Sequence, residues 1–339
     1  MADVAIAILG LNRVGTSMGL ALKRYNTQSA EHQFTITGYD STSDTSRAAK
    51  KMGAIDEIAQ RPEMAARGKD IIVLNLPYGE IEAAYDFISQ DLRPGAVILD
   101  TSPICQTSLE WAKKHLKDDS HVVCIKPILN SKYLFNSVDR IEDAAEDLFD
   151  EGTMLLMPSM RCIKEAIALA SDFSRILGSR NHFLDPAEHD GLMAGVELLP
   201  ELLGTVYFHM ISNSSGWADM QRITNPSFGG LSHPLFDTHP DDLRDQFMKG
   251  SDNLVRYLDE MIAQLREFRK IIADNDRDAV EAALSDASKE YETWINRRHN
   301  NRWQDDEMID SSNSSIGSMM GNMVGGFFGG MRRDKKDDD

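Results

Sequence analysis

The 339-residue chain has little cysteine and no long apolar run. Its three cysteines, Cys105, Cys124 and Cys162, form no CxxC pair, and an odd count of this kind in an acidic globular chain indicates reduced thiols. The apolar run near the N-terminus, MADVAIAILG, has no basic leader and is too short for a secretory signal or a membrane-spanning helix. We therefore expect a cytoplasmic protein without a membrane segment, in which Cys105 and Cys124 act as small buried apolar residues.

Positive charge is also scarce. Lys and Arg number 36 against 54 Asp and Glu, which gives a formal net charge of −18 at pH 7. An acidic excess of this size repels phosphate backbones and anionic lipid headgroups, and the sequence has no local basic patch to offset it. The histidines show neither HxxxH nor HExxH spacing. Nucleic-acid, membrane-surface and metal sites are therefore not expected.

Up to about residue 185, the sequence alternates short apolar runs with longer amphipathic stretches. The runs are too uniformly apolar to have one wet face, which favours a sheet, usually parallel, covered on both faces by crossover helices. Residues 129–144 interrupt this pattern, and we expect them to cross the mouth of the sheet. The strand candidates begin at Val4, Phe34, Asp70, Ala96, His121, Gly152 and Asn181, and the helical links cover 17–25, 80–90, 107–116 and 164–177.

Strand signals stop after residue 183. Asp185 and Pro186 are typical of an N-cap and a first helical residue, and apolar positions then recur at helical spacing over 191–212 and 241–302. These apolar faces exceed what one small helical layer covers, which predicts a symmetric homodimer. The predicted organisation is an α/β domain over 1–184, an all-helical substrate and dimerisation domain over 185–305, and a disordered Gly/Ser/Met-rich tail over 306–339.

The first apolar run ends in a glycine-rich turn, AIAILGLNRVGTSMG. It resembles the GxGxxG turn of Rossmann-type domains, which places free amides and a helix N-terminus against a pyrophosphate. Asn12 replaces the middle glycine and adds bulk where the pyrophosphate approaches. The second run ends in Asp40, at the position that hydrogen-bonds an adenosine ribose and would repel a 2′-phosphate, so NAD is favoured over NADP. The predicted cofactor-binding residues in these two segments are Gly10, Asn12, Arg13, Val14, Gly15 and Asp40.

Several motifs together resemble a known family. GLNRVGTSMGLALK, TGYD, NLP and LDPAEHDGLMAGVELLPELL are similar to the prephenate/arogenate dehydrogenases of tyrosine biosynthesis, from about residue 4 to about residue 300. Members of that family pair a Rossmann domain with a helical dimerisation domain and use NAD(P) to take a hydride from prephenate or arogenate while the ring loses carbon dioxide. The resemblance implies this fold, NAD, a homodimer and a small carboxylate substrate. It also places Leu76 and Pro77, in NLP, at the cofactor.

The substrate positions match that family unevenly. The resemblance places Lys126 where the family has its catalytic histidine, because Lys-Pro-Ile replaces a His-Pro-Met-like motif. Glu197 and Glu201, in Glu-Leu-Leu-Pro-Glu, stand where the family's Ser-His-Leu-Pro-His provides polar ligands to the substrate. His189 matches well. The resemblance therefore supports the fold, the cofactor and the dimer more than it supports prephenate as the substrate.

Three residues are candidates for the chemistry. A lysine half buried at the carboxyl end of a parallel strand can exchange a proton with a hydroxyl or polarise a carbonyl, and the β-hydroxyacid dehydrogenases are similar in using a lysine that way. We therefore expect Lys126 to be the acid/base. By resemblance, Ser102 holds the reacting oxygen and Arg222 binds a substrate carboxylate.

Each candidate also has a simpler interpretation. The glycine turn could lack a ligand, and Asp40 could be a loop cap. Lys126 could be a solvated strand-end lysine, and Ser102 could cap the next helix. Arg222 could pair with Asp219 or Glu201 on a helix surface, and His189 could be a structural hydrogen-bond donor.

Three functions are consistent with these observations. The first is an NAD-dependent prephenate/arogenate dehydrogenase in which Lys126 replaces the histidine. The second is a dehydrogenase of the same fold that uses Lys126 on another small hydroxy or keto carboxylate. The third is a non-enzymatic NAD-binding sensor or scaffold whose tail, from about Asp310, recruits a partner.

Overall fold

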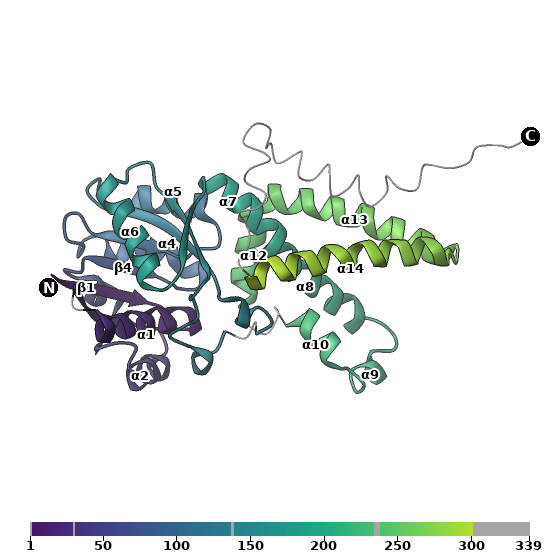
Figure 1. Ribbon diagram of the computed structural model, residues 1–339, viewed down its shortest axis with the longest axis horizontal. Coiled ribbons are helices and arrows are strands. Elements are labelled where there is room, and N and C mark those ends of the chain that lie inside the picture. The colour runs from purple at the N-terminus through teal and green to yellow at the C-terminus, as the bar shows by residue number, and fades with distance from the viewer. Residues whose placement is uncertain (1, 30, 137–138, 234–237, 301–339) are drawn as a thin grey trace, which may run out of the picture. The chain divides into compact units, whose positions relative to one another are not determined.

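The computed structural model describes residues 2–29, 31–136, 139–233 and 238–300 of the chain (Figure 1). They fall into two compact units, residues 1–259 and the residues from 260 onward. The first unit holds a single sheet, the helices that cover it and a following series of helices. The described part of the second unit is helical. The predicted tail, 306–339, lies outside the described residues.

One eight-stranded sheet runs in the order β3-β2-β1-β4-β5-β6-β7-β8. Its first six strands have the 3-2-1-4-5-6 order of doubly wound dinucleotide-binding folds, so the predicted Rossmann-type fold is confirmed. All the predicted strands are present, and β3 is an additional short one. The strands are β1 (Ala2–Leu9), β2 (His32–Tyr39), β3 (Glu57–Ile58), β4 (Ile71–Leu74), β5 (Val97–Asp100), β6 (His121–Ile128), β7 (Thr153–Pro158) and β8 (Arg180–Phe183).

The sheet is not parallel throughout. β7 pairs antiparallel with β6, whereas every other pair in the sheet is parallel. The reason lies in residues 129–152, whose described part contains only two short 3-10 helices, η2 (Ser131–Tyr133) and η3 (Ile141–Asp143). A parallel neighbour needs a crossover, usually a helix, that carries the chain back to the start of the sheet. Without one, the chain re-enters beside β6 and runs in the opposite direction.

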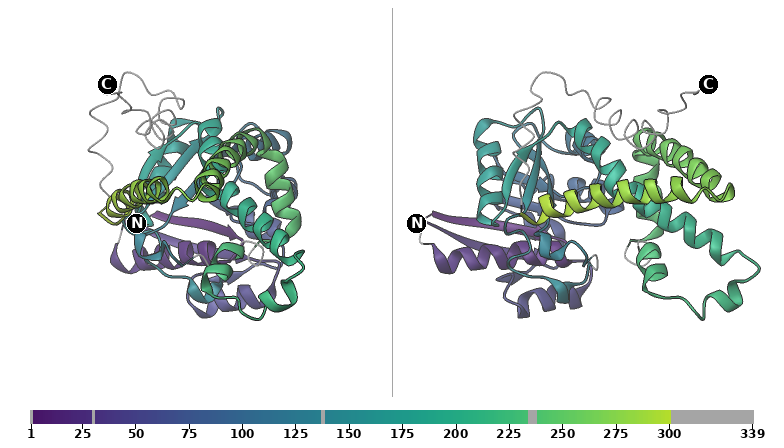
Figure 2. Two further views of the ribbon diagram at one scale, coloured as in Figure 1. Left: turned by 90° about the vertical axis from the view of Figure 1, so that its right-hand side faces the viewer. Right: turned by 45° about the vertical axis from the view of Figure 1, so that its right-hand side comes forward.

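Alternating side chains along the strands bury both faces of the sheet. In β1, Ile6 and Ile8 belong to one hydrophobic cluster, while Ala7 and Leu9 belong to the other. The first cluster includes buried residues of α1 (Arg13–Gln28), α2 (Ser43–Lys51) and α6 (Lys164–Ile176). The second includes residues of α3 (Pro62–Ala66), α4 (Ile81–Ile88) and α5 (Cys105–His115). The predicted covering of both faces is therefore confirmed, and Figure 2 shows helices on both sides of the strands.

The chain after the sheet is helical as far as it is described, as predicted. Asp185 caps the first helix, because its side chain accepts a hydrogen bond of 2.8 Å from the amide of Ala187. We call residues 186–259 the helical segment. The helices are α7 (Pro186–Met193), the π-helical turn η4 (Ala194–Leu198), α8 (Leu199–Ser212), α9 (Trp217–Met220), α10 (Pro226–Ser232), α12 (Pro240–Lys249), α13 (Ser251–Ala273) and α14 (Arg277–Asn300).

The helical segment is joined to loops that follow the carboxyl ends of the strands. Asp190 of α7 accepts hydrogen bonds from the first two amides of α5, at 2.7 and 3.0 Å. Asp242 of α12 accepts one of 2.8 Å from the amide of Gly79, in the turn after β4. Lys126, near the end of β6, forms an ion pair with Glu197 of η4. These contacts bring helical-segment side chains to the sheet end where doubly wound folds bind ligands.

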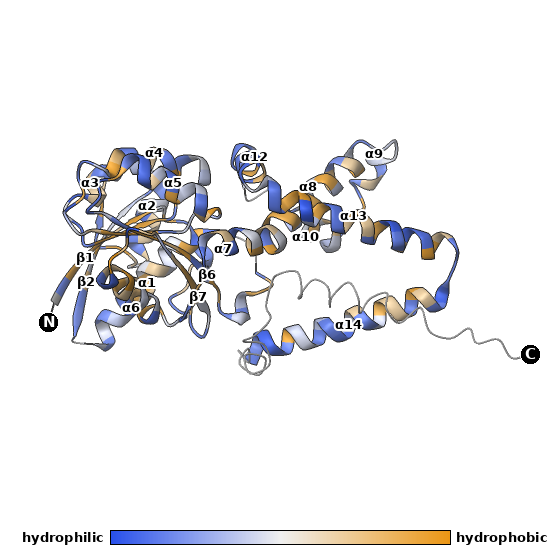
Figure 3. Cartoon of the chain, turned by 90° about the horizontal axis from the view of Figure 1, so that it is seen from above, coloured by the Kyte–Doolittle hydropathy of each residue, from blue (hydrophilic) through white to orange (hydrophobic). Residues whose placement is uncertain are grey.

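The helical segment also carries an apolar run. Pro186–Ser212 is long and apolar enough to cross a membrane by length and composition alone: an 18-residue window in it has a mean hydropathy of 1.2, and 28% of that window is buried. Figure 3 shows α8 as one of its strongly apolar elements. Val206 and Met210 of α8 are more than half exposed, at 54% and 58%. This helix therefore presents apolar side chains that the described residues leave largely exposed.

Candidate functional site

The turn after β1 requires its glycines. Gly10 has a φ of +95°, and a Cβ there would lie 1.9 Å from the carbonyl oxygen of Asn75 and 3.1 Å from the amide nitrogen of Leu76. A Cβ on Gly15 would lie 2.0 Å from the carbonyl oxygen of Gly10. The loop after β4, which continues into Pro77, is thus packed directly against the turn. The structure therefore brings together the predicted Gly10, Gly15 and Leu76.

Asn12 is the N-cap of α1. Its side-chain oxygen accepts hydrogen bonds from the amides of Val14 and Gly15, both at 3.1 Å. The side-chain amide of Asn75 donates to this same oxygen and, at 3.2 Å, to the carbonyl of Gly10. Asn12 therefore does more than add bulk to the turn. Its side-chain oxygen is hydrogen-bonded to two amides at the helix N-terminus that face a pyrophosphate in folds of this kind.

Asp40 links two turns at the end of β2. One carboxylate oxygen accepts from the amide of Leu11 and the other from the amide of Thr42, both at 2.9 Å. The side chain is therefore a loop cap, as the simpler interpretation held. Each carboxylate oxygen has a second lone pair, and the residue is only partly buried, so the same carboxylate can also accept a hydrogen bond from a ribose hydroxyl.

The side chains of Arg13 and Val14 make contacts within the protein. The guanidinium of Arg13 donates to the carbonyls of Asn136 and Asp143, at 2.7 and 3.2 Å, and the residue is 3% exposed. Val14 packs against the core. A cofactor contact from the backbone of either residue is compatible with these side-chain contacts, and their predicted cofactor role stays a prediction.

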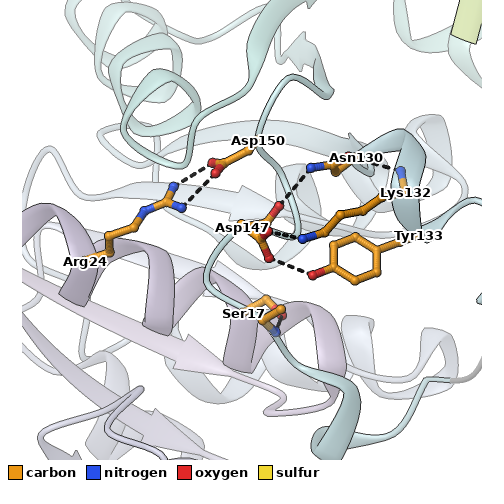
Figure 4. A network of polar contacts seen from close by, with 8 residues as sticks. Ser17, Arg24, Asn130, Lys132, Tyr133, Asp147 and Asp150 are labelled. Atoms are coloured by element: carbon orange, nitrogen blue, oxygen red, sulfur yellow. Dashed lines mark hydrogen bonds and ion pairs between the residues drawn. The ribbon is translucent and has the colours of Figure 1, made fainter. Parts of the chain in front are cut away.

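The loop between β6 and β7 is anchored on α1. The hydroxyl of Ser17 accepts a hydrogen bond of 3.0 Å from the amide of Ala145, and Arg24 binds both carboxylate oxygens of Asp150, at 2.8 and 2.6 Å. Figure 4 shows that the Asp147 carboxylate accepts hydrogen bonds from the ammonium of Lys132 and the hydroxyl of Tyr133, which belong to the same loop. The segment predicted to cross the mouth of the sheet thus lies against the helix that carries the glycine turn.

A charged cluster lies near the end of β6. Lys126 Nζ is 2.6 Å from Glu197 Oε2, and the lysine side chain is 19% exposed. The interpretation of Lys126 as a solvated strand-end lysine is therefore wrong. Glu197 belongs to η4, and π-helical turns occur frequently at functional sites.

Glu201 belongs to the same cluster. It stands four residues after Glu197, and its Oε2 is buried without a hydrogen-bond partner among the residues that the structure describes. Burial raises the pKa of Glu201 to about 7, the negative charge of Glu197 adds to this rise, and the ammonium of Lys126 opposes it. The carboxyl group therefore exchanges a proton near neutral pH.

Ser102 lies at the end of the strand next to Lys126. The parallel register of β5 and β6 ends where Asp100 pairs with Cys124, and Ser102 and Lys126 each follow two residues later. Ser102 is 2% exposed, and within the described ranges its Oγ has no hydrogen-bond partner. It does not cap α5, whose first amides bind Asp190 instead. The helix-cap interpretation of Ser102 is therefore wrong.

Asp100 itself is fully buried beneath Ser102. It accepts hydrogen bonds from the hydroxyls of Tyr85 and Ser108 and, at 2.8 Å, from the amide of Ser102. Burial raises the pKa of Asp100, and these donors oppose the rise. This network fixes the backbone that carries Ser102.

His189 and Asp190 form a buried pair at the start of α7. His189 is 0% exposed, and its Nδ1 lies 2.9 Å from Asp190 Oδ1. Its Nε2 has no hydrogen-bond partner in the described part of the chain. This geometry agrees with a structural hydrogen-bond donor. The role of Asp190 as the cap of α5 was not foreseen, because a cap supplied by another helix leaves no local spacing signal.

Arg222 is not brought to this cluster. It follows α9 and is exposed, and its side chain forms no ion pair with Asp219, Glu201 or any other described residue. The alternative ion pair of Arg222 is therefore absent among the described residues, and its substrate role stays a prediction. Among the described residues, no group of three or more His, Cys, Asp or Glu is placed to hold a metal ion.

Two family models match the chain. Residues 18–182 match "prephenate dehydrogenase, nucleotide-binding domain", and residues 185–286 match "prephenate dehydrogenase, dimerization domain". A curated relative, the cyclohexadienyl dehydrogenase of Zymomonas mobilis, is 23% identical over 276 residues, which cover 80% of this chain and 90% of that protein.

Solved structures share the fold. Prephenate dehydrogenase from Aquifex aeolicus, in complex with hydroxyphenyl propionate and NAD+, has a TM-score of 0.71 at 18% identity and covers 86% of this chain and 98% of that one. Arogenate dehydrogenase of Synechocystis has a TM-score of 0.63 at 18% identity and covers 86% of this chain and 100% of that one. Both comparisons extend over the sheet and into the helices that follow it.

Proposed function

The chain belongs to the prephenate dehydrogenase family of NAD-dependent oxidoreductases, and from this membership we propose that its substrate is prephenate or arogenate. The observation that carries the proposal is the doubly wound strand order with a glycine turn at β1 and an acid at the end of β2, within a chain that matches both family domains. Domain boundaries at 184 and 305, and a cytoplasmic location, are part of the proposal.

NAD fits the residues at the turn. At Gly10 and Gly15 the surrounding backbone leaves no room for a Cβ. Each carboxylate oxygen of Asp40 has a second lone pair that can accept a hydrogen bond from a ribose hydroxyl. The same carboxylate repels a 2′-phosphate, so we propose NAD rather than NADP. The pyrophosphate would lie at the N-terminus of α1, where it competes with Asn12 for the amides. When bound, the nicotinamide supplies an acceptor for hydride.

Lys126 and Ser102 are proposed to bind the reacting oxygen of the substrate. An ammonium has three donors and no acceptor, and that of Lys126 is held in place by Glu197. It therefore donates a hydrogen bond to the substrate oxygen and stabilises negative charge there. Ser102 Oγ, buried just after the end of the neighbouring strand, offers a second polar contact.

A second copy of the chain is proposed to cover the exposed apolar side chains of α8. Residues 185–286 match a dimerisation domain, and this range includes Val206 and Met210. Arg222 lies in the same range, and its role in binding a substrate carboxylate remains a prediction.

A second candidate function is oxidation of another small hydroxy or keto carboxylate. The charged cluster of Lys126, Glu197 and Glu201 favours it, because these residues stand where the resemblance places histidines and a serine. A site built to bind a different pattern of donors and acceptors selects a different substrate.

Growth of a tyrosine auxotroph tests the two functions. The strain lacks its own prephenate or arogenate dehydrogenase and carries this gene on a plasmid. Growth without tyrosine is expected, and the Lys126→Met variant should reduce it if Lys126 binds the reacting oxygen. No growth with a well-folded, NAD-binding protein would favour the second function.

A further inference from the structure

We propose that Glu201 is the catalytic residue that accepts the proton of the reacting hydroxyl, while the Lys126–Glu197 ion pair stands beside it as a fixed charge. This inference rests on the proposed function and assigns the base of that same site. The inference starts from the different surroundings of three side chains. Lys126 comes from β6 of the sheet, and Glu197 of η4 and Glu201 of α8 come from the helical segment.

Lys126 is unsuited to be the base. Its Nζ is 2.6 Å from Glu197 Oε2, in an ammonium–carboxylate pair. A protonated lysine has no lone pair with which to accept a proton. Its ammonium is instead placed to donate a hydrogen bond while it pairs with the carboxylate of Glu197.

Glu197 is also unsuited, because its carboxylate already accepts from Lys126. Glu201 differs from both. Its Oε2 is buried, and no described residue forms a hydrogen bond with it. A buried oxygen of this kind is uncommon in proteins and calls for a partner that the described residues do not provide. A substrate hydroxyl that donates to this oxygen would be such a partner.

The environment of Glu201 suits this task. Burial and the charge of Glu197 raise the pKa of Glu201 to about 7, against the opposing ammonium of Lys126. These two residues are the charged groups that act on it. A base whose pKa lies near the working pH combines an ionised fraction with a useful affinity for the proton. Glu197 thus holds Lys126 in an ion pair and also raises the pKa of Glu201.

The chemistry balances as follows. The O–H bond of the substrate breaks, its proton joins a carboxylate oxygen of Glu201, and the electron pair forms the C=O bond. The hydride from the same carbon passes to the oxidised nicotinamide cofactor, which is the oxidant of the family reaction. In a prephenate-type substrate the bond to the ring carboxylate then breaks, carbon dioxide leaves, and the electron pair enters the ring. The ring oxygen becomes a phenolate, which takes the proton back from Glu201.

The first test is the pH dependence of kcat/KM in three variants. Wild type should lose activity as the pH falls through about 7. Glu201→Gln should lower kcat by about 10²- to 10⁴-fold and abolish this acidic limb. Glu197→Gln should move the limb to lower pH by about one unit, because it removes a negative charge and frees the ammonium of Lys126. Glu165→Gln, at an exposed glutamate of α6, is the matched control and should leave the profile unchanged.

The second test does not use turnover. In protein labelled at the glutamate carboxyl carbons, NMR should show one carboxyl that titrates near pH 7. This signal should be missing in Glu201→Gln and should titrate lower in Glu197→Gln. Thermal protection by NAD shows that each variant is folded.

The outcomes separate the two proposals. Wild type that oxidises neither prephenate nor arogenate would overturn the proposed function, and this assignment with it. If wild type is active but Glu201→Gln keeps both its rate and its acidic limb, only the assignment of Glu201 is overturned. A folded wild-type protein without a glutamate that titrates near pH 7 would also overturn it.

Discussion

At the scale of single residues, Asn12 is the clearest departure from a dinucleotide-binding turn. Its side-chain oxygen satisfies the amides of Val14 and Gly15, so a pyrophosphate bound where we propose would have to displace it. The side chain thus stabilises the unliganded turn, and the loss of these contacts on binding lowers the affinity for the cofactor. A cap of this kind increases the stability of α1 and decreases the affinity for the cofactor.

We predict that Asn12→Gly binds NAD more tightly than wild type, by about 3- to 10-fold, since one displaced hydrogen bond contributes roughly 1 kcal/mol. The loss of stability should be only a few tenths of a kcal/mol, because glycine is a tolerated N-cap. Isothermal titration calorimetry measures the affinity. Asn213→Gly, at the end of α8, is the control and should bind as wild type does. Weaker binding by Asn12→Gly would show that the asparagine helps to hold the cofactor.

Single residues also show what the sequence could reveal. Gly10, Gly15 and Asp40 were found because their spacing relative to the strands is local information. Asn75, which bonds to both Gly10 and Asn12, gave no such signal, since the contact joins residues 65 and 63 positions apart. The ion pair between Lys126 and Glu197 spans 71 positions and was likewise not foreseen.

At the scale of elements, α7 caps α5. Asp190 accepts from the amides of Cys105 and Gln106 and from His189 Nδ1. The buried carboxylate thereby satisfies two free donors of another helix and joins the helical segment to the sheet. The contact between Asp190 and the start of α5 lies a few residues after Ser102, which follows the end of β5.

We predict that Asp190→Ala lowers the free energy of unfolding by about 2 to 4 kcal/mol, because it removes a cap and leaves buried donors without partners. Asp185→Ala removes only the exposed cap of α7 itself and should cost about 1 kcal/mol. Urea denaturation measures both. Equal losses in the two variants would mean that the cap of α5 contributes nothing beyond an ordinary N-cap.

The elements themselves were largely predictable. Uniformly apolar runs and helical spacing identified the long strands and helices, because both patterns are set by burial. The direction of β7 was not predictable from its own residues, since an apolar run has the same pattern in either direction. It depends on the loop 129–152, whose anchoring on α1 by Arg24 and Asp150 joins residues 126 positions apart.

At the scale of the whole molecule, the exposed apolar side chains of α8 bear on assembly. We predict a homodimer by light scattering, and Val206→Glu should shift it towards monomer because a buried charge at an interface is costly. Phe87→Glu, at an equally exposed apolar residue of α4, is the control and should leave the dimer intact. A monomeric wild-type protein at micromolar concentration would contradict the proposed role of this helix.

The central claim is that a chain with a lysine in place of the family's histidine still oxidises a substrate of that family. Purified protein with NAD, and with prephenate or arogenate in parallel, tests it through the absorbance of the reduced nicotinamide. The account predicts turnover with at least one of the two substrates and a large loss of kcat in Lys126→Met. Protection by NAD against thermal unfolding, without turnover of either substrate, would contradict it.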